Sequence, residues 1–137
     1  LAGGLLAGAA HDPQNRSHIK YGLVAEEAGK DTFDNILNSL DQLASKYKTS
    51  KGNIAAQFVL QTPGISSVIL GPRNSKHLNE LDELSQLLLD KDDYDELFAL
   101  ADKNRRPDED VYSYERDVEG KHGRIMKYNL NGMRSPK

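Results

Sequence analysis

A short run rich in apolar β-branched residues, Ile65 to Leu70, is the feature that most constrains how this chain can fold. Pro63 and Gly64 precede the run, and Gly71 ends it. Such a run predicts a strand that is buried on both faces, as in a parallel sheet. Its backbone N–H and C=O groups need partners. We expect the partners to come from the start of the chain, from a further segment or from another chain. The run therefore predicts that the chain is part of a larger α/β unit.

Helical patterns surround this run. Apolar residues recur three and four positions apart in the segments on both sides of it, which is the spacing of an amphipathic helix. Ser50 is a good N-cap, and Leu78, Leu81, Leu84 and Leu88 form the apolar stripe of the helix after the strand. The predicted helices run from Asp31 or Thr32 to Lys48, from Ser50 to Gln61, from about Ser75 to Leu88, and from Asp90 or Asp92 to about Asn104.

The remaining segments carry no such period. Residues 1–10 contain several glycines and alanines, and residues 11–30 are polar with Pro13, Gly22 and Gly29, so both segments are interpreted as loops. Residues 105–137 are predicted to form an extended C-terminal tail laid over a surface. The chain is therefore divided into residues 1–104 and a tail of residues 105–137.

Composition excludes several classes of function. The chain of 137 residues has 18 basic and 21 acidic side chains, and this net charge of −3 argues against nucleic acid as the main partner. The absence of cysteine excludes disulfides and thiolate chemistry. No apolar run approaches the ~20 residues of a membrane span. We expect a cytoplasmic protein with no metal site.

The loop after the predicted strand has the residues of an anion site. A helix N-terminus offers unpaired N–H groups, Gly71 lets a bulky group approach the backbone, and Arg73 adds a planar charge suited to phosphate. Ser75 can donate its hydroxyl or cap the helix. The same residue types also serve as turn formers, and Arg73 could be a solvated surface charge. Local chemistry leaves both interpretations open.

Three segments resemble the aldo-keto reductase family. They are "LAGGLLAG", "SKGNIAAQFVLQTPGISSVILGPRNSKHL" and "LNELDELSQLL", and together they cover roughly residues 1–104. The resemblance implies that residues 1–104 are the C-terminal β/α part of a (β/α)8 TIM barrel that binds NADP(H). The first segment resembles the one after barrel strand seven and is entered at Leu1, so we expect the chain to start inside a longer protein.

The resemblance also implies a set of cofactor-binding residues. The backbone of the first segment would line the pyrophosphate, the loop after the strand would hold the adenosine 2′-phosphate with Arg73 as the main charge, and an acidic residue would lie near the adenine. Leu81 departs from the family pattern, which has Asn there. The implied residues are Leu1, Gly4 and Leu6; Gly71, Arg73, Asn74 and Ser75; His77, where many relatives have Gln; and Glu80.

The catalytic residues of the family have no counterpart in this chain. Members reduce carbonyls by hydride transfer with a Tyr, a Lys, an Asp and a His from the first four strands. We expect a cofactor-binding portion whose catalytic half is elsewhere, or alternatively an inactive subunit with a structural or regulatory role. Expected partners are NADP(H), a small carbonyl substrate and, as an open alternative, another protein chain that completes the barrel or contacts the tail. Neither nucleic acid nor a membrane is expected.

Overall fold

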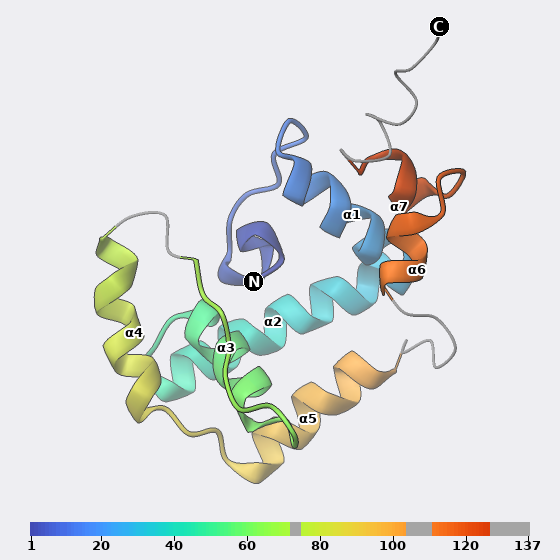
Figure 1. Cartoon of the computed structure of the whole chain (residues 1–137). Coiled ribbons are helices and arrows are strands. Elements are labelled where there is room, and N and C mark those ends of the chain that lie inside the picture. The colour runs from blue at the N-terminus through green and yellow to red at the C-terminus, as the bar shows by residue number, and fades with distance from the viewer. Residues whose placement is uncertain (72–74, 104–110, 127–137) are drawn as a thin grey trace, which may run out of the picture.

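A computed structural model describes residues 1–71, 75–103 and 111–126, and these fold almost entirely into helices (Figure 1). Within the described ranges, no helix combines the length and the apolarity that crossing a bilayer requires. The elements are the 3₁₀ helix η1 (Ala2–Ala7) and the α-helices α1 (Arg16–Ala28), α2 (Lys30–Tyr47), α3 (Lys51–Gln61), α4 (Lys76–Gln86), α5 (Lys91–Asp102), α6 (Val111–Arg116) and α7 (Lys121–Arg124).

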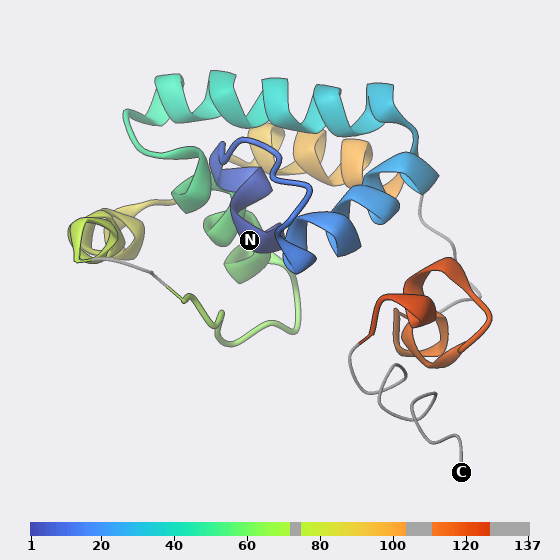
Figure 2. The ribbon, with the colours of Figure 1, turned by 90° about the horizontal axis from the view of Figure 1, so that it is seen from above.

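The core lies between α2, α3 and α5. Helices α2 and α5 run side by side, and α3 packs against α2 (Figure 2). Ile54 of α3 is completely buried at the centre. The buried core residues are Leu40, Leu43, Ile54, Ala55, Leu89 and Leu97. Burial of the apolar faces of these helices is the main source of stability.

The predictions for α2, α3 and α5 are confirmed to within a residue or two at each end. Ser50 caps α3, because its hydroxyl accepts a hydrogen bond from the Asn53 N–H at 3.1 Å. Lys48 ends α2 in the left-handed conformation. Asp90 stands at the N-cap position of α5, although its side chain makes no cap hydrogen bond.

Helix α4 is shorter than predicted, and its leucine stripe is largely unburied. Leu84 packs inside, whereas Leu78 is 52% exposed and Leu88, beyond the helix end, is 70% exposed. The side chain of Leu81 lies outside the described residues. The periodic pattern therefore produced the helix, but no described element covers the whole apolar face.

The loop predicted for residues 11–30 is wrong, because α1 occupies most of it. Pro13 precedes the helix, and the Asn15 side chain caps it by accepting the Ser17 N–H at 3.0 Å. Gly22 lies in the helix interior, where glycine costs only about 1 kcal/mol relative to alanine. Gly29, at φ 89°, separates α1 from α2.

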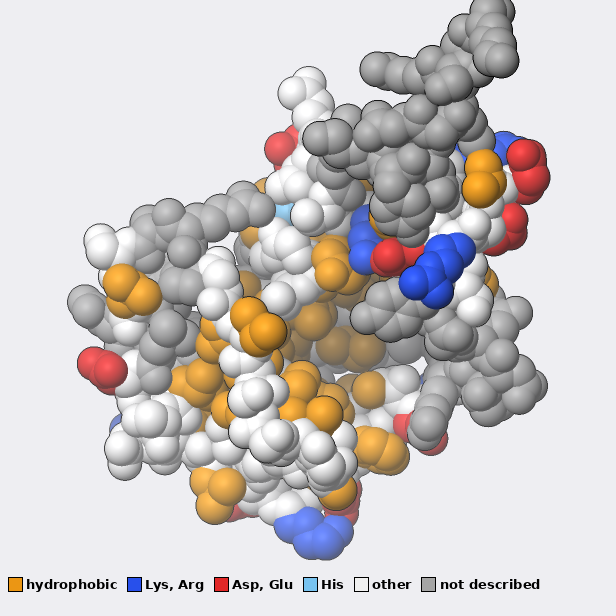
Figure 3. Space-filling view, viewed as in Figure 1, with side chains coloured by type: hydrophobic (Ala, Val, Ile, Leu, Met, Phe, Trp, Pro, Cys, Tyr) orange, Lys and Arg blue, Asp and Glu red, His pale blue; other side chains and the backbone are white. Residues whose placement is uncertain are grey.

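The strand predicted for residues 65–70 is not formed, and the α/β class is not seen in the described residues, which contain no strand. Ile69 is 98% exposed. The segment stands clear of the helices in Figure 2, and Figure 3 shows apolar side chains gathered over it and α3. A strand forms only against a neighbour that satisfies its backbone, and the described part of the chain supplies none.

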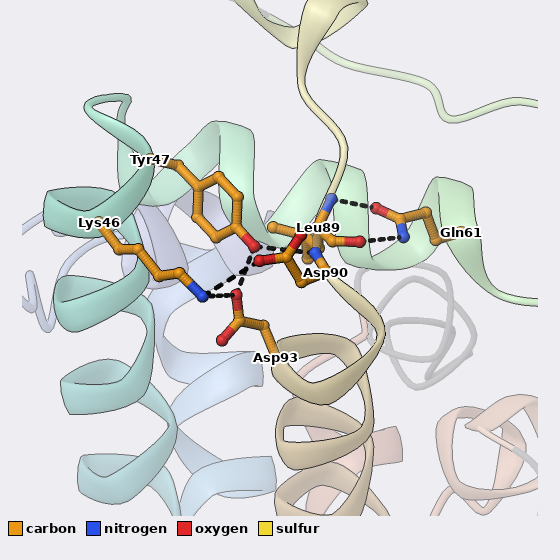
Figure 4. Close-up of polar contacts among 6 residues, drawn as sticks. All are labelled: Lys46, Tyr47, Gln61, Leu89, Asp90 and Asp93. Carbon is orange, nitrogen blue, oxygen red and sulfur yellow. Dashed lines mark hydrogen bonds and ion pairs between the residues drawn. The ribbon is translucent and has the colours of Figure 1, made fainter.

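Hydrogen bonds join the elements before this open segment to those after it. The Gln61 amide at the end of α3 donates to the Leu89 carbonyl at 3.0 Å and accepts the Leu89 N–H at 2.8 Å (Figure 4). Thr49 donates to the Glu83 carboxylate at 3.0 Å and so joins the start of α3 to α4. The helices before and after residues 65–70 are therefore held together without that segment.

The extended tail is wrong for residues 111–126, which form α6 and α7 and dock on α1. Lys20 of α1 pairs with Glu115 of α6, and Glu27 of α1 lies 3.2 Å from Nε2 of the buried His122 of α7. The corner between α6 and α7 is tight, because a Cβ on Gly123 would lie 1.9 Å from the Asp117 carbonyl oxygen. Residues 104–110 and 127–137 lie outside the described part.

Candidate cofactor site

The glycine-rich turn of η1 presents bare backbone. Gly3 and Gly4 have φ values of 68° and 103°, in the left-handed region that favours glycine. The Gly4 N–H donates to the Leu1 carbonyl at 2.9 Å, and the Gly4 carbonyl accepts the Ala9 N–H at 3.0 Å. The two glycines carry no side chains of their own, although Ser17 and His18 pack beside Gly3 and Ala9 packs beside Gly4.

A buried histidine of α1 makes a hydrogen bond to the backbone of this turn. His18 is 4% exposed, and its Nε2 lies 3.0 Å from the Gly3 carbonyl oxygen. Its Nδ1 accepts the Asp12 N–H at 2.9 Å. A backbone N–H can only donate, so Nδ1 is unprotonated and Nε2 carries the proton that is donated to Gly3. The sequence analysis missed this contact, because it joins residues far apart with no local pattern.

The second predicted loop is described in part. Gly71 is exposed, and no described atom lies within 4 Å of the position that its Cβ would take. Ser75 is exposed at the N-cap position of α4 and makes no side-chain cap hydrogen bond. Arg73 and Asn74 lie outside the described residues. His77 and Glu80 belong to α4, but their side chains are not described.

Helix α3 contacts η1 and α4, which contain or follow the predicted loops. Its N-terminal end contacts η1, since a Cβ on Gly52 would lie 3.5 Å from that of Ala7 and 3.6 Å from the Leu1 side chain. Leu6 packs against the core that α3 helps to form. The other loop leads into α4, which also contacts α3. Leu1, Gly4 and Leu6 therefore lie together in η1, and Gly71 and Ser75 flank the entry to α4.

A cluster of tyrosine, lysine and aspartate lies between α2 and α5. These are residue types that catalyse carbonyl reduction in the family, but here they join two helices. The Tyr47 hydroxyl donates to the Asp93 carboxylate and accepts the Asp90 N–H at 2.8 Å, while Lys46 Nζ lies 2.7 Å from Asp93 (Figure 4). Burial raises the pKa of Tyr47, so its hydroxyl is a poorer proton donor than free tyrosine. The hydrogen bond from Lys46 lowers the pKa of Asp93.

This cluster fastens two helix ends. It joins the last turn of α2 to the first turn of α5, where acidic residues complement the helix dipole. That charge pattern was the sequence signal that could have revealed it. We call these four residues, Lys46, Tyr47, Asp90 and Asp93, the α2–α5 clamp. The described side chains contain no group of three or more His, Asp or Glu that could hold a metal ion.

Comparison with known proteins identifies the chain. The model of the aldo/keto reductase family matches residues 1–102, which include η1, the segment of residues 65–71 and helices α1 to α5. No curated protein and no solved structure matched the chain. The family match covers well over half of the sequence and contains both predicted loops. The chain therefore belongs to the aldo/keto reductase family.

Proposed function

We propose that this chain is the cofactor-binding C-terminal portion of an NADP(H)-dependent aldo-keto reductase, whose catalytic residues are not among these 137 residues. The family consists in general of NADP-dependent oxidoreductases and has the TIM-barrel fold. The observation that carries the proposal is that the family match spans two loops, and that one of them has the bare, positive-φ backbone of a phosphate-binding turn. The substrate would be a small carbonyl compound.

The described residues fit the phosphates of a dinucleotide. Gly3 and Gly4 contribute no side chain that would obstruct an approaching pyrophosphate. Gly71 borders open space, and the exposed Ser75 stands at the N-terminal end of an 11-residue helix, where N–H groups favour an anion. We assign the pyrophosphate to Leu1, Gly4 and Leu6, and the 2′-phosphate to Gly71, Arg73, Asn74 and Ser75. When bound, NADPH supplies the hydride for carbonyl reduction.

We also propose that residues 65–70 pair as a strand of the barrel when the remaining strands are present. The exposed Ile69, and a segment that leaves its backbone open, support this pairing. The strands would come from the same protein or from another chain. His77 and Glu80 would then lie beside the adenine end of the cofactor.

Nucleotide titration of the intact protein, expressed from its full reading frame, tests the proposal. Fluorescence titration should show that Arg73→Ala weakens NADPH binding roughly 10- to 100-fold, since one charge-assisted hydrogen bond contributes about 1.5–3 kcal/mol. NADH lacks the 2′-phosphate, so its affinity should stay unchanged. Arg124→Ala removes an exposed arginine of α7 and is the matched control. Equal NADPH affinity in Arg73→Ala and the wild type would contradict the assignment.

The second candidate is a catalytically inactive subunit of the same family with a structural or regulatory role. One observation favours it, because Leu81 stands where the family resemblance calls for an adenine-contacting Asn. A carbonyl-reduction assay with NADPH separates the candidates. Turnover by the intact protein supports the first, and nucleotide binding without turnover on a panel of aldehydes and ketones supports the second.

A further inference from the structure

We propose that His18 is a positioning residue, which fixes the peptide between Gly3 and Gly4 and so keeps the Gly3 carbonyl oxygen away from a bound pyrophosphate. This inference rests on the proposed function, which assigns that turn to the cofactor. It adds a residue of α1, outside both predicted loops, whose side chain acts on the ligand only through the backbone of the turn.

The peptide between Gly3 and Gly4 is held at both of its polar ends. His18 Nε2 donates to the Gly3 carbonyl oxygen at 3.0 Å, and the Gly4 N–H donates to the Leu1 carbonyl at 2.9 Å. Glycines flank this peptide on both sides, so steric barriers to its rotation are low. The hydrogen bond from His18 therefore has a larger share in fixing the orientation than it would between residues with side chains.

The ring that provides this bond is itself fixed. Nδ1 of His18 accepts the Asp12 N–H at 2.9 Å, which selects the tautomer with the proton on Nε2. The ring is buried, and it also contacts the turn directly. A Cβ on Gly3 would lie 3.1 Å from Cδ2 of His18 and 2.8 Å from Cβ of Ser17. The first turn of α1 thus fills the space on one side of the glycine turn, and we assign the pyrophosphate to another side.

Loss of the hydrogen bond from His18 to Gly3 would let the Gly3 carbonyl oxygen change its position relative to a bound anion. A rotated peptide would carry its carbonyl oxygen away from the histidine ring, and the partial negative charge of that oxygen repels a phosphate. The effect should fall on the pyrophosphate, which NADPH and NADH share. It differs in this respect from the effect of Arg73, which we assign to the 2′-phosphate of NADPH alone.

Two isosteric variants separate the two hydrogen bonds of the ring. In His18→Gln, the side-chain amide can reach the place of Nε2 and still donate to Gly3. In His18→Asn, the shorter amide can take the place of Nδ1 and accept from Asp12 but cannot reach Gly3. His18→Ala removes both bonds. His11→Ala is the control, because the exposed His11 ring lies beside that of His18, with a centroid separation of 5.9 Å.

The experiment is a titration of the intact protein and these variants with NADPH and with NADH. We expect His18→Asn and His18→Ala to weaken both nucleotides roughly 5- to 10-fold, the value of about one neutral hydrogen bond, and His18→Gln to stay within about threefold of the wild type. Hydrogen exchange of the Gly4 amide should be faster in the same two variants. The ¹⁵N spectrum of the His18 ring should show a protonated Nε2 and an unprotonated Nδ1.

The outcomes distinguish a failure of the role proposed for His18 from a failure of the proposed cofactor-binding function. If the wild type binds nucleotide and His18→Asn binds both forms equally well, the positioning role of His18 is overturned and the proposed function stands. If the wild type binds neither nucleotide, the proposed function fails and the cofactor role of His18 fails with it. Should His18→Ala not fold, the pair His18→Gln and His18→Asn still decides, because their difference isolates the bond to Gly3.

Discussion

Removal of one oxygen atom, in the variant Tyr47→Phe, should loosen α5 from α2. The Tyr47 hydroxyl joins two partners of the α2–α5 clamp, since it donates to the Asp93 carboxylate and accepts the Asp90 N–H. Phenylalanine keeps the ring, which packs against the core, and loses both hydrogen bonds. The variant therefore tests the polar part of the contact alone.

The expected cost is about 1–2 kcal/mol in the free energy of unfolding. A hydrogen bond to a charged group contributes about 1.5–3 kcal/mol and a neutral one about 0.5–1.5 kcal/mol. The loss is smaller than their sum, because Lys46 still holds Asp93 at 2.7 Å and water can reach the exposed Asp90.

Urea unfolding of the intact protein measures the global loss, and hydrogen exchange of the α5 amides locates it. Tyr94→Phe is a matched control on α5, because its hydroxyl makes a single long bond of 3.3 Å to Thr62. We expect that control to cost no more than about 0.5 kcal/mol. Unchanged stability and α5 exchange in Tyr47→Phe would refute the reasoning that the clamp stabilises this pair of helices.

Three further outcomes follow from local geometry. Ser50→Ala should cost about 1 kcal/mol in urea unfolding, whereas Ser75→Ala, at an N-cap position with no cap bond, should cost much less. Gly123→Ala should speed hydrogen exchange throughout α6 and α7, because its Cβ would lie 1.9 Å from the Asp117 carbonyl oxygen; unchanged exchange would contradict the tight corner. Because its lysine partner lowers the pKa of Asp93, the stability that this carboxylate contributes is present above the ordinary pKa of about 3.9 and is lost as pH falls through the lowered value. Asp93→Asn should therefore remove part of the acid-induced loss of stability, and an unaltered acid profile would contradict this assignment.

Helices α2 and α3 were predictable because their signals are local. A strong apolar period and the capping hydroxyl of Ser50 act within a few residues of each other. Helix α1 was missed because Pro13 and Gly22 resemble breaks, although one precedes the cap and the other is tolerated inside the helix. The predicted strand did not form because its formation is not decided locally. The apolar run of residues 65–70 is clear in the sequence, but strand formation depends on partners that the described residues do not include.

In the candidate site too, local features could be predicted and contacts between distant residues could not. The glycine turn could be recognised from its own residues, because a positive φ favours glycine. Its support by His18 could not, since the contact to Gly3 depends on how α1 folds back. The clamp likewise joins the end of one helix to the start of another, and the sequence signals only their complementary charges.

Because two hydrogen bonds join Gln61 to Leu89, we expect the packing of α2, α3 and α5 to survive a break in the covalent connection through residues 65–70. New termini placed there by circular permutation should leave α2, α3 and α5 assembled, and a chain cut at this point should behave as two fragments that reassociate. The helices can therefore assemble first, and the pairing that we propose for residues 65–70 can be the last step of assembly.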